Sequence, residues 1–252
     1  MKKTIAVSLF AMTVSGFANA AIMEVYSTNF TTTSVAAGVG ASLVGGFIGT
    51  ATGTYTASDG KTWDGNYLNG NGGLSTLILS DLPTHTGVSI DMLLGFLNSW
   101  DGSGSTPGGV SPDYLNIAID GVNILQMTTN NTPLNTPSFF GGGTQLINDG
   151  AIDGNTYTNT TATFGDDLVD MATASALTFA HTASTLNLQI VSTGPGWQGW
   201  PDEGWGMDSL SVSLTTGDVA VPEPATLALF GIGFAGLGAA RRRQLKAHSL
   251  MA

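Results

Sequence analysis

Apolar and polar residues alternate with a period of two through the central part of the chain. The pattern is clearest at Leu115–Ile119, Leu186–Ile190 and Leu210–Leu214, where every second residue is a large aliphatic one. Successive side chains of a β-strand point to opposite faces of the sheet, so this period indicates strands with one buried and one solvated face. Further strands are expected at residues 22–33, 42–56, 74–80, 88–100, 122–128 and 174–180.

Turn-forming dipeptides separate these segments. Asn69-Gly70, Asp101-Gly102 and Asp120-Gly121 are examples, and such pairs tolerate the positive φ that tight turns need. Between the two chain ends, the sequence offers only one short helical turn, at residues 166–174. We therefore expect an all-β fold, an antiparallel β-sandwich.

The N-terminus has the pattern of a secretory signal peptide. Lys2 and Lys3 precede an apolar stretch, and Ala18 and Ala20 place small residues at the two positions that signal peptidase reads. The apolar stretch is too short for a membrane span. We expect a signal peptide at residues 1–20 that is removed after Ala20.

The C-terminal residues 219–246 combine a short acidic motif, an apolar segment and a basic tail. The apolar residues 225–240 are expected to form a transmembrane helix, which at about 1.5 Å per residue covers roughly 24 Å of a bilayer core about 30 Å thick. The basic tail should remain cytoplasmic, which places the preceding residues on the outer side. The flanking motif residues are Pro222, Glu223, Pro224, Arg241, Arg242 and Arg243.

This order of proline, acid, proline, short apolar helix and arginine cluster resembles the PEP-CTERM sorting signal of Gram-negative bacteria. The resemblance implies that an exosortase cleaves near Pro222–Pro224, in bacteria that make extracellular polysaccharide. It also implies transient anchoring in the inner membrane, followed by release to the cell surface or the extracellular matrix. Signal peptidase, exosortase and extracellular polysaccharide are the expected partners.

The remaining residues 21–218, called the passenger below, are strongly acidic. They contain 17 acids and a single basic residue, Lys61. Such a surface repels phosphate backbones, so nucleic-acid binding is excluded. The chain has no cysteine, and His85 and His181 do not stand in a zinc-motif spacing. No G-x-S-x-G motif is present, and we expect the passenger not to be an enzyme.

Two loops carry residues that suit a cation. One follows the strand at 88–100 and the other precedes the last strand, and together they hold five carboxylates. Calcium prefers six to eight oxygen ligands, so these acids predict a calcium site if the loops meet, although aspartate next to glycine is also a common turn former. The candidate ligands are Asp101, Asp113, Asp202, Glu203 and Asp208.

The second loop also holds Trp197, Trp200 and Trp205, whose flat faces could stack on a sugar ring or fill the core. The order of these strands and loops, over residues 88–120 and 194–214, resembles jelly-roll sandwiches of the galactose-binding-like and lectin-like kind. The resemblance implies a non-catalytic carbohydrate-binding or structural module.

Two other functions remain open. The first is a glycan-active enzyme, which would need paired carboxylates roughly 5 to 10 Å apart across a groove. The second is an ice-binding protein, because threonines alternate at residues 50–56 and nearly so at 156–163. Ice-binding faces need such rows repeated on neighbouring strands, and no fixed-period repeat is visible in the sequence.

Overall fold

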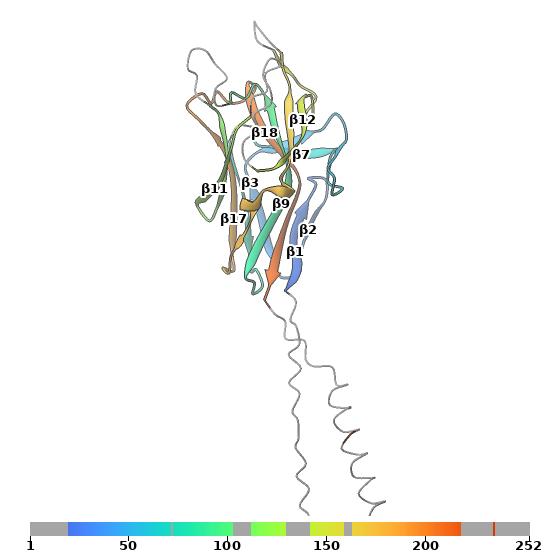
Figure 1. The fold of residues 1–252 in the computed structure, drawn as a ribbon, viewed down its shortest axis with the longest axis vertical. Coiled ribbons are helices and arrows are strands. Elements are labelled where there is room, and N and C mark those ends of the chain that lie inside the picture. Colours follow the sequence, from blue (N-terminus) through green and yellow to red (C-terminus); the bar gives the residue numbers. More distant parts are fainter. Residues whose placement is uncertain are drawn as a thin grey trace, which may run out of the picture. The chain divides into compact units, whose positions relative to one another are not determined.

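The computed structural model describes residues 20–71, 73–102, 112–129, 142–158 and 163–217, and residue 234 (Figure 1). Residues Ile22–Gly217 form one compact unit. Both hydrophobic clusters of the structure lie within this unit, so the passenger has the core that independent folding requires.

The larger sheet has nine strands. Its main path is β12-β15-β9-β18-β1-β2, while β16 pairs with β9, and β7 joins β4 to β18. The strands are β1 (Ala21–Thr28), β2 (Thr33–Val35), β4 (Phe47–Thr50), β7 (Asn66–Asn69), β9 (Gly87–Asn98), β12 (Thr144–Gly150), β15 (Asp166–Asp170), β16 (Thr178–Ala180) and β18 (Glu203–Thr216). The central pair β9–β18 is antiparallel, with a register shift between Asp208 and Ser211.

The smaller sheet has five antiparallel strands in the order β11-β10-β17-β8-β3. They are β3 (Gly40–Val44), β8 (Leu74–Ser80), β10 (Tyr114–Ile119), β11 (Val122–Met127) and β17 (Leu186–Thr193). Two short hairpins complete the description: β5 (Tyr55–Thr56) with β6 (Thr62–Trp63), and β13 (Tyr157–Thr158) with β14 (Thr163–Phe164). The expected all-β antiparallel fold is confirmed, and the jelly-roll winding stays a prediction.

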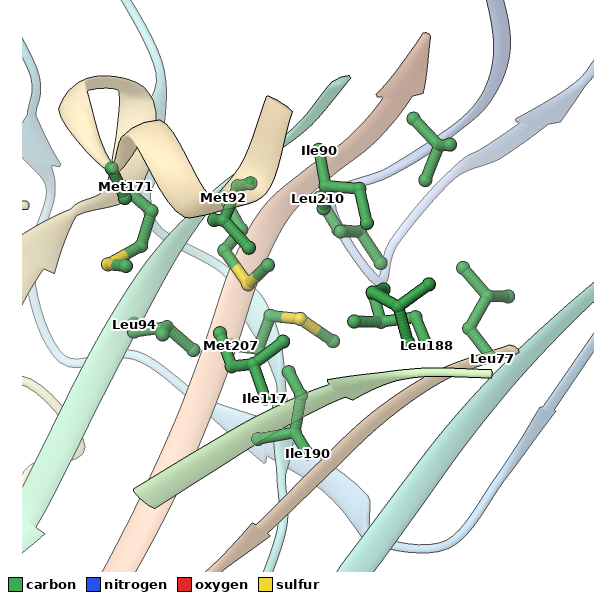
Figure 2. Close-up of a cluster of buried hydrophobic side chains, with 14 of the residues drawn as sticks. Leu77, Ile90, Met92, Leu94, Ile117, Met171, Leu188, Ile190, Met207 and Leu210 are labelled. Atoms are coloured by element: carbon green, nitrogen blue, oxygen red, sulfur yellow. The ribbon is translucent and has the colours of Figure 1, made fainter. Parts of the chain in front are cut away.

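The main core lies between the two sheets. Ile90, Met92 and Leu94 of β9 face Ile117 of β10 and Leu188 of β17 (Figure 2). All five are at most 2 % exposed, and each stabilises the fold by about 1.5–3 kcal/mol relative to an exposed side chain. For β10 and β17, the alternation in the sequence therefore identified the inward residues correctly.

A second cluster covers the outer face of the larger sheet. Trp63 and Tyr67 lie over Leu93 and Leu97 of β9, so this strand is buried on both faces. The Trp63 ring fits because two glycines, Gly95 and Gly206, are paired across β9 and β18. A Cβ at either position would lie within 3.0 Å of the Trp63 ring. The glycines in these two strands are therefore a packing requirement.

Several expected boundaries were wrong. Residues 166–174 are mainly strand β15, followed by the single 3₁₀ turn η1 (Met171–Thr173). The segment 42–56 is three strands. At Gly45 and Gly46, which adopt positive φ, the chain passes from β3 of the smaller sheet to β4 of the larger one, and residues 51–54 separate β4 from β5. The segment 22–33 divides into β1 and β2, and 174–180 begins with the 3₁₀ turn η2 (Ser175–Leu177) before β16.

The expected signal peptide and transmembrane helix lie outside the described residues, apart from Ala20 and Phe234. Within the described part of the chain, no helix has the length and hydropathy to cross a membrane.

Candidate metal centre

Three carboxylates from different parts of the chain converge where β9 ends and β10 and β18 begin. Asp101 follows β9, Asp113 precedes β10, and Glu203 is the first residue of β18. One oxygen from each lies within 4.8 Å of the other two. Two oxygens on a common calcium ion, each at most about 2.6 Å from it, can be about 5.2 Å apart, so the spacing suits one shared cation.

Three hydrogen bonds hold the residues around this point together, two within the first loop and one between the two loops. The Asp101 N–H donates to Asp113 Oδ2 at 2.7 Å, and the Asp113 N–H donates to the Asp101 carbonyl at 2.8 Å. The Trp100 indole donates to the Gly204 carbonyl at 2.6 Å. These bonds hold the end of β9 against the starts of β10 and β18, so the carboxylates are positioned by the sheets themselves.

Glu203 is buried and held in place by the loop before it. Its side-chain oxygen Oε2 accepts from the Gln198 backbone N–H at 2.6 Å, and the residue is 0 % exposed. Burial raises the pKa of Glu203, the Gln198 N–H opposes that rise, and the Asp113 charge adds to it. The hydrogen bond from Gln198 therefore offsets only part of the cost of burying the Glu203 charge.

Asp113 shares this condition. It is 0 % exposed, burial raises its pKa, and its Oδ1 atom has no hydrogen-bond partner among the described residues. A buried unpaired oxygen is costly, and either a bound cation or a proton shared with Glu203 would remove the cost. The pKa of Asp101 is also raised, by burial and by the charge of Asp202. The donor set, with hard oxygens and an excess of negative charge, fits calcium.

Asp202 borders the cluster. Its Oδ1 atom accepts a hydrogen bond from the Ser99 hydroxyl, and its carbonyl accepts from the Ser99 N–H at 2.9 Å. These bonds join the second loop to the end of β9. Asp202 is not one of the three converging ligands, so its place is beside the centre.

Asp208 lies elsewhere, which corrects its assignment as a ligand of this site. Its carboxylate accepts from the Ser209 N–H at 2.6 Å and from the Asp64 N–H at 3.2 Å. Burial raises its pKa to about 7. Asp208 precedes the register shift in β18, where Ser209 has a φ of 50°, and its side chain supports that irregularity.

The three tryptophans of the second loop separate into two kinds. Trp205 is fully buried at 0 % exposure and donates to the Gly73 carbonyl, so it has no face for a sugar, contrary to its assignment as a binding residue. Trp197 and Trp200 are half-buried. Trp197 packs against Trp100 with ring centroids 5.3 Å apart, while Trp200 lies over Gly204.

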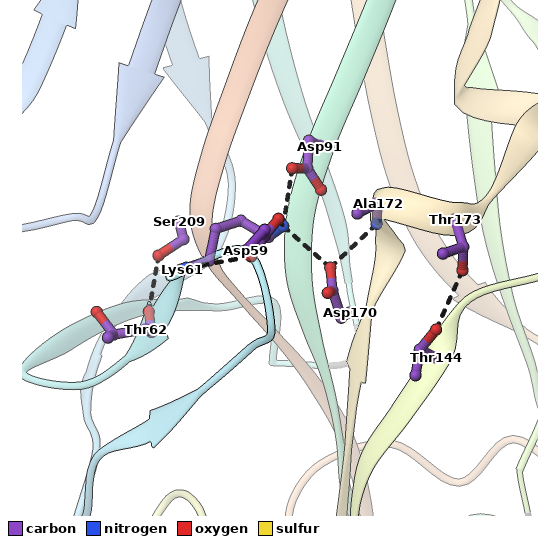
Figure 3. Close-up of polar contacts among 9 residues, drawn as sticks. All are labelled: Asp59, Lys61, Thr62, Asp91, Thr144, Asp170, Ala172, Thr173 and Ser209. Carbon is purple, nitrogen blue, oxygen red and sulfur yellow. Dashed lines mark hydrogen bonds and ion pairs between the residues drawn. The ribbon is translucent and has the colours of Figure 1, made fainter.

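A second acidic group surrounds Lys61. Its ammonium contacts Asp59, Asp91 at 2.8 Å and Asp170 at 3.0 Å (Figure 3). The hydrogen bond and charge of this lysine lower the pKa of Asp59. Because Lys61 is the one basic residue of the passenger and is committed here, it cannot neutralise the Asp101–Asp113–Glu203 cluster.

The first threonine row does not form a continuous strand face. Thr50 ends β4 and Thr56 belongs to β5, while Thr52 and Thr54 lie in the connection between them. In the second row, Thr158 and Thr163 face one another across the β13–β14 pair, and Thr160 lies outside the described residues. Among the residues that the structure describes, the two rows do not form the continuous flat array that ice binding requires.

Sequence reasoning missed the groups that hold the carboxylates. Gln198 and Ser99 are ordinary loop residues in the sequence, and their contacts with Glu203 and Asp202 appear only once the loops are folded. The tryptophan before Asp101 was the available signal, since its indole bond to Gly204 brings the two loops together.

No curated protein sequence matches the chain significantly. Residues 220–243 match the family model described as the PEP-CTERM protein-sorting motif. This match covers the expected motif, and it supports export, a transient C-terminal membrane anchor and processing by an exosortase. The chain thus carries a PEP-CTERM sorting motif on the C-terminal side of an all-β passenger.

Proposed function

We propose that the passenger is a non-catalytic surface or matrix module that binds extracellular polysaccharide, with calcium organising its binding loops. The observation that carries the proposal is the convergence of Asp101, Asp113 and Glu203 at the junction of the two sheets. A cation there would neutralise three carboxylates and fix the loops that contain Trp197 and Trp200.

The glycan part of the proposal rests on the half-buried tryptophans next to this centre. Trp200 stands three residues before Glu203, and its ring lies over Gly204, the next residue of β18, so a cation that holds Glu203 would also steady the Trp200 ring. A flat aromatic face suits the apolar side of a pyranose. The sorting motif, whose resemblance implies a polysaccharide-producing bacterium, supports the same ligand class.

The enzyme alternative is less well supported. A retaining glycosidase places its two carboxyl groups about 5–5.5 Å apart on either side of the substrate bond, and an inverting one places them farther apart. Asp113 and Glu203 instead have ligand oxygens within 4.8 Å of one another and are both 0 % exposed. Carboxylates buried against each other offer no room for a sugar ring, which favours the binding role.

A glycan-binding screen of residues 21–217 tests the proposal. Binding should occur with millimolar calcium and disappear with a chelator. Asp101→Asn should weaken binding, whereas Asp81→Asn, an exposed aspartate away from the centre, should not. Trp200→Ala should weaken glycan binding and leave calcium binding intact. A passenger that binds calcium but no glycan in any preparation would refute the glycan role.

A further inference from the structure

The two histidines of the passenger meet at the end of β9 that is opposite the metal centre. His85 precedes β9 and His181 follows β16, and the sequence separates them by 96 residues. The His85 Nε2 atom lies 2.7 Å from His181 Nδ1, and the ring planes are 17° apart with centroids at 5.0 Å. Their contact is one that the spacing of the two histidines in the sequence did not indicate.

The pair is part of a longer chain of hydrogen bonds. At one end, His85 Nδ1 lies 2.7 Å from the Pro83 carbonyl oxygen. At the other end, His181 Nε2 lies 3.2 Å from Asp120 Oδ2. The second Asp120 oxygen already accepts from the Asn187 N–H at 2.8 Å. A carbonyl and a carboxylate can only accept, so both ends of the chain require a donor from the histidines.

The number of hydrogen bonds that can form at once depends on the number of protons that the group holds. This series of hydrogen bonds has three contacts, and each contact needs one proton between its two heavy atoms. Two neutral imidazoles carry two protons, one on each ring. The third contact is made only if the group binds one more proton, shared among the rings and Asp120.

We propose that His85, His181 and Asp120 form a proton-operated clasp, which is closed when it holds three protons. The clasp joins both sheets, because His85 and His181 adjoin β9 and β16 of the larger sheet and Asp120 lies in the β10–β11 turn of the smaller one. It also lies next to the end of β18, since the Thr86 N–H donates to the Thr215 carbonyl. Loss of the third proton leaves two acceptors facing each other and opens one contact.

The two rings are buried, while the Asp120 end of the hydrogen-bond chain reaches solvent, because the Asp120 side chain is 39 % exposed. His85 is 2 % exposed, and the His181 side chain is 8 % exposed. Asp120 is the charged side chain that contacts the rings among the described residues. The other neighbours are the Phe179 ring, 6.3 Å from His181 between centroids, and the Pro83 carbonyl. Asp81, on the preceding loop, contacts Ser80 instead.

The sign of the pH effect follows from proton linkage. Above a pH of about 6.5 the unfolded histidines are largely neutral. A folded state that retains the third proton then binds one proton more than the unfolded state, so its stability falls as pH rises. Per pH unit, the unfolding equilibrium constant should rise by up to tenfold until the folded clasp itself loses the proton.

Asp120→Asn provides the decisive comparison. The amide oxygen can keep the Asn187 contact, and the amide NH₂ can donate to a neutral His181, so three contacts form with two imidazole protons. Denaturant unfolding of residues 21–217 between pH 6.5 and 9 should show a steeper loss of stability in the parent than in Asp120→Asn. The difference should approach tenfold per pH unit. Buried carboxylates that titrate in this range are common to both proteins and cancel.

Imidazole ¹⁵N NMR of the folded parent gives a second readout. At pH 7.5 the pair should hold three ring protons, or two with a protonated Asp120, and in Asp120→Asn it should hold two neutral rings. Equal pH slopes for the two proteins, or two neutral rings beside an ionised Asp120 in the parent, would overturn the proposal.

Discussion

Calcium and protons should compete for the Asp101–Asp113–Glu203 cluster, and this competition gives the site a characteristic pH dependence. Burial raises the pKa of Glu203 to about 8 and, together with the neighbouring charges, raises that of Asp113. At neutral pH the pair therefore retains a proton that a calcium ion must displace, since calcium binds ionised carboxylates. Affinity should rise with pH, because fewer protons then need to be removed.

The size of the effect follows from the number of protons released. If binding releases about one proton, the calcium affinity rises by up to about tenfold per pH unit between pH 6 and 8 and then levels off near the pKa of Glu203. Over this range the gain in binding free energy is up to about 2.8 kcal/mol, at about 1.4 kcal/mol per tenfold. At calcium one hundred times its dissociation constant, the passenger should gain about 2.7 kcal/mol of stability and roughly 5–10 °C in melting temperature.

Isothermal titration of residues 21–217 in buffers with different ionisation heats measures both the affinity and the protons released. The salt concentration should stay near 0.15 M, where surface charges are already screened beyond about 8 Å. Asp101→Asn removes one ligand and should weaken binding, while Asp81→Asn serves as the matched exposed control. An affinity that does not change from pH 6 to 8 would refute the competition, and an absence of binding would remove calcium from the centre.

Three further predictions concern other parts of the chain. Lys61→Met should lower the free energy of unfolding in urea by about 3 kcal/mol, and Lys61→Arg should change it little. The value is at the low end of the range for breaking a buried ion pair, because Asp59 and Asp91 reach solvent. Gly70→Ala should lower the free energy of unfolding by about 1–3 kcal/mol and alter tryptophan fluorescence, because the added Cβ would lie 1.9 Å from the Trp205 ring. Gly60→Ala is the control: its Cβ meets open space, so only the strain of its positive φ remains. Replacing Pro222 and Glu223 by alanine should block processing and leave a longer membrane-bound form on immunoblots, and normal maturation would contradict the sorting assignment.

The alternation of residues predicted β10, β17 and the second half of β18, whose large aliphatic residues lie in the main core. Strands β8, β10 and β17 were expected almost as they are, because each has one buried and one solvated face. Strand β15 was missed because Asp166–Asp170 is buried throughout and has no alternation, with acids at positions that a sequence pattern assigns to the surface. Its carboxylates are satisfied by distant groups, such as the Asn98 N–H on Asp166.

The candidate site was only partly predictable for a similar reason. The sequence identified Asp101, Asp113 and Glu203 because they flank the two tryptophan loops, and the folded loops bring them together. It also included Asp208, which is five residues beyond Glu203 but on a strand that carries it away from the cluster. The pairing of His85 with His181 had no sequence signal, because it depends on where β16 joins β9.

Terbium luminescence tests the central claim, a cation held by Asp101, Asp113 and Glu203, most directly. Terbium substitutes for calcium at oxygen sites and is sensitised by nearby tryptophan, and Trp100 immediately precedes Asp101 and packs against Trp197. Excitation of tryptophan in residues 21–217 should produce terbium emission that calcium displaces and that Asp101→Asn strongly reduces, with Asp81→Asn unchanged. Emission that is absent, or that is equal in the parent and Asp101→Asn, would contradict the account.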